Sequence, residues 1–223
     1  MKYVILIPIY NDRESLKLLI ENINHELKDL NHEISIVVIN DASSQQIIDN
    51  YPNIENISSL EIINMKENRG HARCIASGLK YIFEKKEFDF VIPMDGDGED
   101  RPEEIKKFIQ LSEQSAEKSI IGERVKRSEG LFFKICYQFH KFLTLAFTGQ
   151  SIKFGNFTCL SKAIVKKMLE EKATWNSFSG SLKKIEKDLI STPSIRGKRY
   201  FGPSQMSFFN LLKHSLSIIS VFR

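Results

Sequence analysis

Hydrophobic and polar positions follow two alternating patterns over the first 123 residues. Short apolar runs predict buried strands at residues 3–8, 34–39, 60–65, 88–93 and 119–122. Between them, apolar residues spaced three and four apart predict helices over residues 12–30, over about 72–82 after Gly70, and from Pro102 onward. Strands that alternate with helices predict an α/β fold, a mostly parallel twisted sheet with flanking helices.

The pattern changes beyond residue 124, where apolar spacing predicts helices at about 130–147, 161–171 and 205–222. The last helix forms a C-terminal amphipathic segment, and core packing, dimerisation and binding to a membrane surface all fit its pattern. No stretch is rich enough in Gly, Pro or Ser to be a linker. We therefore expect a single domain over residues 1–223, with halves at 1–123 and 124–223.

Charge differs sharply between these halves. Residues 1–123 hold 14 Lys and Arg against 23 Asp and Glu, whereas residues 124–223 hold 18 against 5 and 12 of the 16 phenylalanines. A basic, aromatic-rich half favours a partner that is anionic and apolar, such as a membrane surface or a lipid phosphate. Nucleic acid is the competing interpretation. It is disfavoured because Phe132, Phe139 and Phe142 have a helical spacing typical of a core.

Length and composition narrow the class of protein further. With 223 residues, 42% of them hydrophobic, the chain is long enough to bury a core. No apolar run approaches the roughly 18 residues of a membrane-spanning helix, and the N-terminus does not read as a signal peptide. The three cysteines are far apart and indicate neither a zinc site nor a disulfide framework. We expect a cytoplasmic, globular protein.

An acidic loop follows the strand predicted at residues 88–93, and its carboxylates are Asp95, Asp97, Glu99 and Asp100. Like charges this close repel, and a divalent cation among them relieves the repulsion. Carboxylate oxygens suit Mg²⁺ or Mn²⁺. A calcium EF-hand is excluded because its twelfth position is Lys106. The alternative is that Asp100, Glu103 and Glu104 complement the positive end of the next helix, and we keep it for the two glutamates.

Polar loops also follow the first three predicted strands, at residues 8–12, 40–43 and 68–71. Ligands of parallel α/β sheets bind where the strands end. Tyr10 is placed to stack on a base, Asp41 to accept a hydrogen bond from a base, and Arg69 to hold a phosphate. Plainer roles stay open: the first loop caps a helix, Asp41 forms a turn, and His71 is a solvated first-turn residue.

Taken in order, these loops carry a family resemblance. The motifs are Pro8-x-Tyr10-Asn11, Asp41-x-Ser43, Asn68-x-Gly70-His71, Asp95-x-Asp97, Gly122-Glu123-Arg124, Gly155-Asn156-Phe157 and Arg196-Gly197-x-Arg199, then Gly202 and Ser204. The set resembles the family 2 glycosyltransferases, and more closely the branch of dolichyl-phosphate mannosyltransferases and bacterial polyprenyl-phosphate sugar transferases. The similarity covers nearly the whole chain.

The resemblance implies a GT-A fold, a nucleotide-sugar donor, a DxD metal site for Mg²⁺ or Mn²⁺, and inversion at the anomeric carbon. By that resemblance the metal ligands are Asp95, Asp97 and Glu99, which replaces a glutamine of the mannosyltransferases. The residues assigned to the nucleotide sugar are Pro8, Tyr10, Asp12, Asp41, Arg69 and Asp95. Those assigned to phosphates are Arg124, Arg196, Arg199 and Ser204, and those assigned to catalysis are Asp97, Arg124, Asn156 and Arg199.

The chain departs from many bacterial relatives at Asn156, where they carry an aspartate considered for base catalysis. A hydroxyl acceptor needs a general base, whereas a phosphate monoester is already an anion. Asn156 therefore favours a lipid-phosphate acceptor, although Glu170 or Glu186 remains an alternative base. The basic segment Arg196–Ser204 is interpreted as a lid over donor and acceptor, with a solvated loop as the alternative.

The sequence thus predicts a metal-dependent, inverting glycosyltransferase that moves a sugar from a UDP- or GDP-linked donor to a polyprenyl phosphate. We expect it to act as a peripheral protein on the inner face of the cytoplasmic membrane, without nucleic acid. A homo-oligomer or a membrane-protein partner stays open. Alternatives are transfer to a saccharide hydroxyl in surface-polysaccharide assembly and a non-catalytic nucleotide-sugar-binding protein. A nucleotidyltransferase is disfavoured because residues 8–12 contain no glycine.

Overall fold

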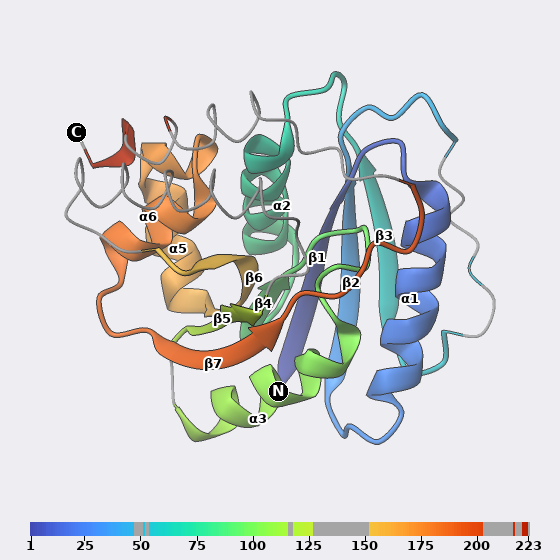
Figure 1. Cartoon of the computed structure of the whole chain (residues 1–223), viewed down its shortest axis with the longest axis horizontal. Coiled ribbons are helices and arrows are strands. Elements are labelled where there is room, and N and C mark those ends of the chain that lie inside the picture. Colours follow the sequence, from blue (N-terminus) through green and yellow to red (C-terminus); the bar gives the residue numbers. More distant parts are fainter. Residues whose placement is uncertain are drawn as a thin grey trace.

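The computed structural model describes residues 1–46, 51, 54–115, 118–126, 152–202, 216 and 220–222 (Figure 1). The elements of the first half are β1 (Lys2–Ile9), α1 (Arg13–Leu27), β2 (Glu33–Asn40), β3 (Ser59–Asn64), α2 (His71–Lys85), β4 (Phe90–Pro93), the 3₁₀ turn η1 (Pro102–Glu104), α3 (Ile105–Gln114) and β5 (Ile120–Lys126). Those of the second half are β6 (Phe154–Ser161), α5 (Lys162–Glu170), the 3₁₀ turn η2 (Lys172–Trp175), α6 (Phe178–Ile185) and β7 (Ile190–Ile195).

Within the described residues, seven strands form a sheet in the order β3-β2-β1-β4-β6-β5-β7. The first four strands in this order are parallel to one another. Strand β6 is antiparallel to both β4 and β5, and β5 is parallel to β7. The predicted mostly parallel α/β sheet is confirmed, and its parallel part brings four strand ends to one edge.

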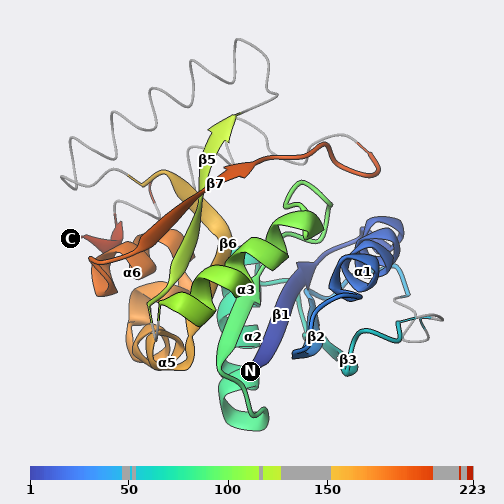
Figure 2. The same ribbon diagram turned by 90° about the horizontal axis from the view of Figure 1, so that it is seen from below.

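Helices cover both faces of the sheet, as the alternating side chains of β1 show. Tyr3, Ile5 and Ile7 share a buried cluster with α1 and α3. Val4 and Leu6 belong to a second cluster with α2, α5 and α6 on the opposite face. Figure 2 shows this layered arrangement of helix, sheet and helix. The helices between strands hold the sheet rigid, so the loops at its edge are carried on fixed supports.

The prediction for the second half was partly wrong. Helix α5 is confirmed, but β5 continues to Lys126, and β6, α6 and β7 were not predicted. Helix α1 ends at Leu27, earlier than expected. The helix expected at 130–147 lies outside the described residues, as does most of the one expected at 205–222, of which Leu216, Ser220 and Val221 are helical.

A glycine inside α2 tests the packing of this helix on the sheet. A Cβ atom at Gly78 would lie 2.3 Å from Cδ1 of Leu6 and 2.9 Å from Cγ1 of Ile39. In a free helix Gly→Ala stabilises by about 1 kcal/mol, but overpacking costs about 1–3 kcal/mol. We expect Gly78→Ala to lower the free energy of unfolding, measured by urea denaturation. Exposed Arg73→Ala on the same helix is the control, and a stabilised Gly78→Ala would contradict this packing.

Candidate active site

The loops after β1 and β2 are tied together at the edge of the sheet. The Asn11 side-chain oxygen accepts hydrogen bonds from the backbone N–H groups of Ser44 (2.9 Å) and Gln45 (3.3 Å). In return, the Asn11 N–H donates to the Ser43 hydroxyl at 2.8 Å. Asn11 has a φ of 50°, in the left-handed region that asparagine tolerates better than most residues. One side chain thus fixes how the second loop lies against the first.

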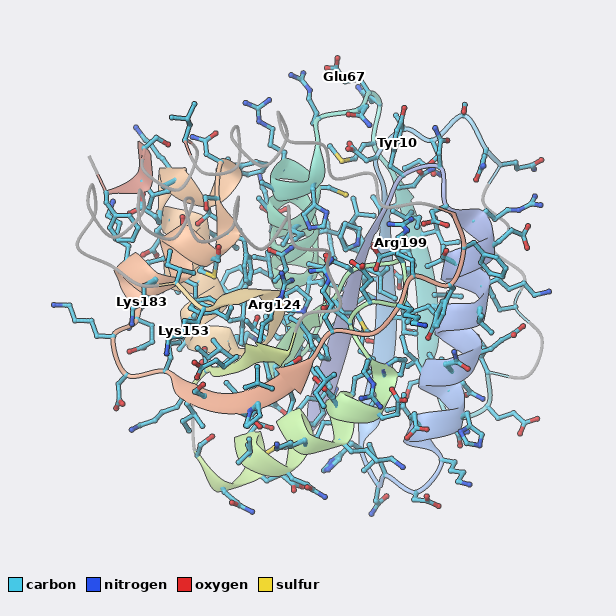
Figure 3. All side chains as sticks on the ribbon, in the orientation of Figure 1. Tyr10, Glu67, Arg124, Lys153, Lys183 and Arg199 are labelled. Carbon is cyan, nitrogen blue, oxygen red and sulfur yellow. The ribbon has the colours of Figure 1, made fainter. Side chains whose placement is uncertain are left out.

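These loops open into a cavity of about 230 Å³. Its lining comprises residues 10–14, Gln45, Arg199, Phe201 and Gly202. Tyr10 is 53% exposed and lines this cavity together with Arg199; both residues are labelled in Figure 3. Gln45 and Phe201 were not singled out by the sequence, because no pattern connects them to the first strand. Pro8 is buried at the end of β1.

Asp41 holds the backbone that leads into α2 at this edge of the sheet. Its two carboxylate oxygens accept hydrogen bonds from the backbone N–H groups of Arg69 (2.8 Å) and Gly70 (2.9 Å), just before α2. Asp41 is 3% exposed. The carboxylate therefore satisfies orphan donors at the start of the helix. Contact with a base stays a prediction for this residue.

The four carboxylates of the acidic loop lie between β4 and η1. Asp100 is buried, and its Oδ2 accepts a hydrogen bond of 2.9 Å from the backbone N–H of Asp95, which closes the loop on itself. Burial and the charge of Asp95 raise the pKa of the Asp97 carboxyl to about 6, and the same causes raise the pKa of Asp100 to about 7. Crowded, part-buried negative charge of this kind fits a divalent cation.

The segment Arg196–Tyr200, here called the arginine segment, lies along the acidic loop. Arg199 donates from Nη1 to Asp97 Oδ2 at 2.8 Å and from Nη2 to Asp12 Oδ2 at 2.5 Å. Arg196 donates to Glu99 Oε2, with 2.7 Å from its Nε. The two guanidinium groups therefore occupy carboxylates that the resemblance assigns to the metal and the nucleotide.

Backbone contacts reinforce this position of the arginine segment. Gly197 N–H donates to the Glu99 carbonyl at 2.8 Å, and Tyr200 N–H donates to the Asp97 carbonyl at 3.0 Å. The Tyr200 ring lies against Gly98, where a Cβ would come within 2.5 Å of it, and Gly98 has a φ of +84° that favours glycine. The segment predicted to be a lid thus lies directly on the acidic loop.

Within the part of the chain that the structure describes, no three His, Cys, Asp or Glu side chains are grouped so as to hold a metal. Asp97 and Glu99 are paired with arginines instead. The carboxylates supply suitable oxygen ligands, and a cation there has to compete with Arg196 and Arg199 for them.

His71 is half-exposed at the start of α2, as the interpretation as a solvated first-turn residue expects, but it also lies beside Asp95 together with Asn156. His71 Nε2 is 3.2 Å from Asp95 Oδ1 and 2.7 Å from Asn156 Nδ2. Desolvation lowers the pKa of the His71 imidazole, but the hydrogen bond and the charge of Asp95 outweigh this effect and raise it. His71 in turn lowers the pKa of Asp95. The proximity was not predictable, because α2 and β6 are far apart in sequence.

Arg124 approaches the same cluster from β5. A Cβ at Gly155 would lie 2.5 Å from Arg124 Nη2, so the guanidinium rests over the backbone of β6. Its charge helps to lower the pKa of Asp95 and partly opposes the rise in the pKa of Asp100. Figure 3 labels Arg124, which lies in β5, and Arg199, which lies in the segment that follows β7. The structure therefore brings three of the predicted phosphate-binding arginines to the acidic loop.

Other predicted residues lie apart from this cluster. The Arg69 side chain pairs with exposed Glu67. Glu186 lies in the loop before β7, where its side chain accepts a hydrogen bond from the Asp188 N–H. Glu170 is the last residue of α5 and is exposed. Among the described residues neither glutamate contacts the acidic loop, which weakens both as a general base. Ser204 lies outside the described residues.

None of the helices that the structure describes is both long enough and apolar enough to cross a bilayer.

The fold and the strand-end site together define the class of protein. The structure of glucosyl-3-phosphoglycerate synthase from Mycobacterium tuberculosis, in complex with Mn²⁺, UDP-glucose and phosphoglyceric acid, covers 99% of this chain and 78% of that one, with a TM-score of 0.68 at 12% identity. The alignment with the structure of S. aureus TarS 1–349 in complex with UDP-GlcNAc covers 98% of this chain and 66% of that one, with a TM-score of 0.61 at 15% identity. The chain thus has the predicted GT-A fold.

A profile of Glycosyl transferase family 2 matches residues 4–171, and the chain belongs to this family. An undecaprenyl-phosphate 4-deoxy-4-formamido-L-arabinose transferase of Photorhabdus laumondii is 30% identical over 95% of the chain, and one of Proteus mirabilis is 27% identical over 95%. The chain spans 65% and 64% of the length of these curated relatives.

Proposed function

We propose that the protein is an inverting glycosyltransferase that uses a divalent cation and transfers a sugar from a UDP- or GDP-linked donor to a polyprenyl phosphate. One observation carries the proposal: the acidic loop and three arginines converge at the edge where the parallel strands end. Such an edge is where α/β sheets bind ligands, and this arrangement of charge suits a metal-bound diphosphate. Tyr10, beside the cavity, is placed to stack on the base.

The arginine segment takes part by exchanging partners. In the structure, Arg199 neutralises Asp97 and Asp12, and Arg196 neutralises Glu99. When donor binds, both arginines turn from carboxylate to phosphate, which accepts the same charge-assisted hydrogen bonds. When bound, a divalent cation supplies Lewis-acid stabilisation of the charge that develops on the leaving nucleoside diphosphate. The arginines then stabilise the remainder of that charge.

The acceptor is inferred from charge and from the lack of a base. Asn156 occupies the position beside Asp95 and cannot take a proton, whereas a phosphate monoester attacks without losing one. Arg124, over Gly155, is placed to hold that phosphate. The relatives from Photorhabdus laumondii and Proteus mirabilis, which are named undecaprenyl-phosphate 4-deoxy-4-formamido-L-arabinose transferases, support the same acceptor. Transfer to a saccharide hydroxyl is the alternative.

The basic second half supports a location on the inner face of the cytoplasmic membrane. Residues 124–223 carry an excess of 13 positive charges, which an anionic lipid surface attracts. The lipid tail of the acceptor also resides in that surface. We propose peripheral binding of one protein domain, with residues 1–123 for the donor and residues 124–223 for the acceptor and membrane.

A transfer assay tests this function. Purified protein is mixed with radiolabelled UDP- or GDP-sugars, Mn²⁺ or Mg²⁺, and polyprenyl phosphate in detergent, and lipid-linked sugar is measured by extraction. We expect product with the lipid phosphate and none with the dephosphorylated polyprenol. Product on a saccharide hydroxyl alone would favour the alternative acceptor. Nucleotide-sugar binding without transfer to any acceptor would favour a non-catalytic binding protein.

Gly155 tests the position of Arg124. A Cβ at Gly155 displaces the guanidinium, and a shift of about 1 Å at a reacting centre costs up to roughly 100-fold in rate. We expect Gly155→Ala to lower kcat/KM for the lipid phosphate by about tenfold or more, with an unfolding free energy within about 0.5 kcal/mol of wild type. Ser191→Ala on neighbouring β7 is the control. Unchanged kinetics in Gly155→Ala would remove Arg124 from acceptor binding.

A further inference from the structure

Three side chains from separate elements meet at one side of the acidic loop. His71 begins α2, Asp95 follows β4, and Asn156 lies in β6. His71 Nε2 is 3.2 Å from Asp95 Oδ1 and 2.7 Å from Asn156 Nδ2, and Nδ2 is 3.4 Å from the same Oδ1. Each of the three atoms therefore lies within 3.4 Å of the other two.

Hydrogen bonds alone satisfy this triangle poorly. The His71 Nε2 atom has one in-plane position, so it either donates to Asp95 or accepts from the Asn156 amide. A half-turn of the amide puts its oxygen in the place of Nδ2, since the two orientations have the same shape. One N–H is then shared between two acceptors. Three candidate ligand atoms thus lie in mutual contact, and a single proton satisfies them incompletely.

The triangle has the dimensions of one face of an octahedral metal site. Ligand atoms bound at about 2.1 Å and at right angles lie about 3.0 Å apart. The three measured separations, 2.7, 3.2 and 3.4 Å, bracket that value. Asp41 accepts hydrogen bonds from the N–H groups of Arg69 and Gly70, just before α2, and its charge partly offsets the positive terminus of that helix near the site.

We propose that His71, Asp95 and the Asn156 side-chain oxygen bind the divalent cation directly, and that the imidazole makes the site select Mn²⁺ over Mg²⁺. This inference rests on the proposed function and names the metal of the same site. Imidazole nitrogen suits first-row transition metals, whereas Mg²⁺ prefers oxygen ligands and retains its water. Asp97 and Glu99, which are paired with arginines, then join only when the donor draws those arginines away.

Pulsed electron paramagnetic resonance of Mn²⁺ bound to the full chain tests the ligand set without any turnover. We expect ¹⁴N hyperfine coupling from a directly bound imidazole in the wild type and its loss in His71→Ala and His71→Gln. Mn²⁺ affinity should fall by roughly tenfold or more in His71→Ala, because losing even an outer-shell partner costs that much. Mg²⁺ affinity, measured by competition, should change less than about threefold.

Exposed His25 on α1 supplies the matched control, and His25→Ala should leave coupling and affinity unchanged. Mn²⁺ bound in the wild type without nitrogen coupling, or coupling that survives in His71→Ala, would overturn the inference. Calorimetric titration of the same samples with UDP and GDP separates the two claims. Mn²⁺-dependent nucleotide binding without nitrogen coupling would leave the proposed function standing, whereas a wild type that binds no Mn²⁺ with or without nucleotide would contradict both.

Discussion

Asp97→Asn is expected to reduce sugar transfer by at least about a thousandfold while leaving the fold intact. Asp97 is placed to hold the cation and to orient Arg199, and electrostatic stabilisation of a leaving group is worth several kcal/mol. The raised pKa of Asp97 means that the folded protein disfavours its charge. Neutralising it should therefore not lower the free energy of unfolding at pH 7.

Turnover and chemical denaturation of the same preparation check this prediction. Asp89, just before β4, is the matched control, because its Oδ2 accepts a hydrogen bond from the Lys2 N–H at the other end of the sheet. Asp89→Asn should keep wild-type turnover. An Asp97→Asn variant that retains more than about a tenth of the activity would show that the carboxylate does not serve the metal.

Arg199→Ala is expected to change two affinities in opposite directions. Arg199 is the cationic partner of Asp97 and Asp12, and its side chain is 16% exposed. Without it, Mn²⁺ meets less competition in the ligand-free protein and should bind more tightly. Nucleoside diphosphate should bind roughly 10- to 100-fold more weakly in the presence of Mn²⁺, because a charge-assisted hydrogen bond to phosphate is lost.

Calorimetric titrations with Mn²⁺ alone, and with UDP or GDP at saturating Mn²⁺, measure the two affinities. Arg199→Lys should lie between wild type and Arg199→Ala, since lysine keeps the charge but loses the two-pronged contact. Lys118→Ala removes an exposed ion pair with Asp188 and should change neither value. If both affinities fall in Arg199→Ala, the arginine is a structural support and not an exchanging partner.

The first half of the fold was predictable because each element leaves a local signal. Buried strands such as β2 are continuous apolar runs, and α2 carries a clear helical spacing. The second half lacks such signals. Strand β7 has the sequence ISTPSI, in which the buried positions are the polar residues Thr192 and Ser194. Pro193 is tolerated there because β7 lies at the sheet edge. Strand β6 contains Gly155 and Asn156, and it pairs antiparallel with β4 from far along the chain.

The candidate site, like the fold, was predictable from the sequence only in part. The acidic loop was predictable, because four carboxylates after a buried strand must lie at the end of that strand. The partners of those carboxylates were not. Arg199 reaches Asp12 across 187 positions, and His71 meets Asn156 across 85. Such contacts are set by how the chain crosses the sheet, and no local periodicity encodes them.

A crystal structure with Mn²⁺ and a nucleoside diphosphate tests the central claim most directly. We expect an anomalous manganese peak within bonding distance of an oxygen of Asp97 or Asp95, with the diphosphate between the ion and Arg199. Manganese and nucleotide bound elsewhere, with Arg199 still paired to Asp97, would contradict it.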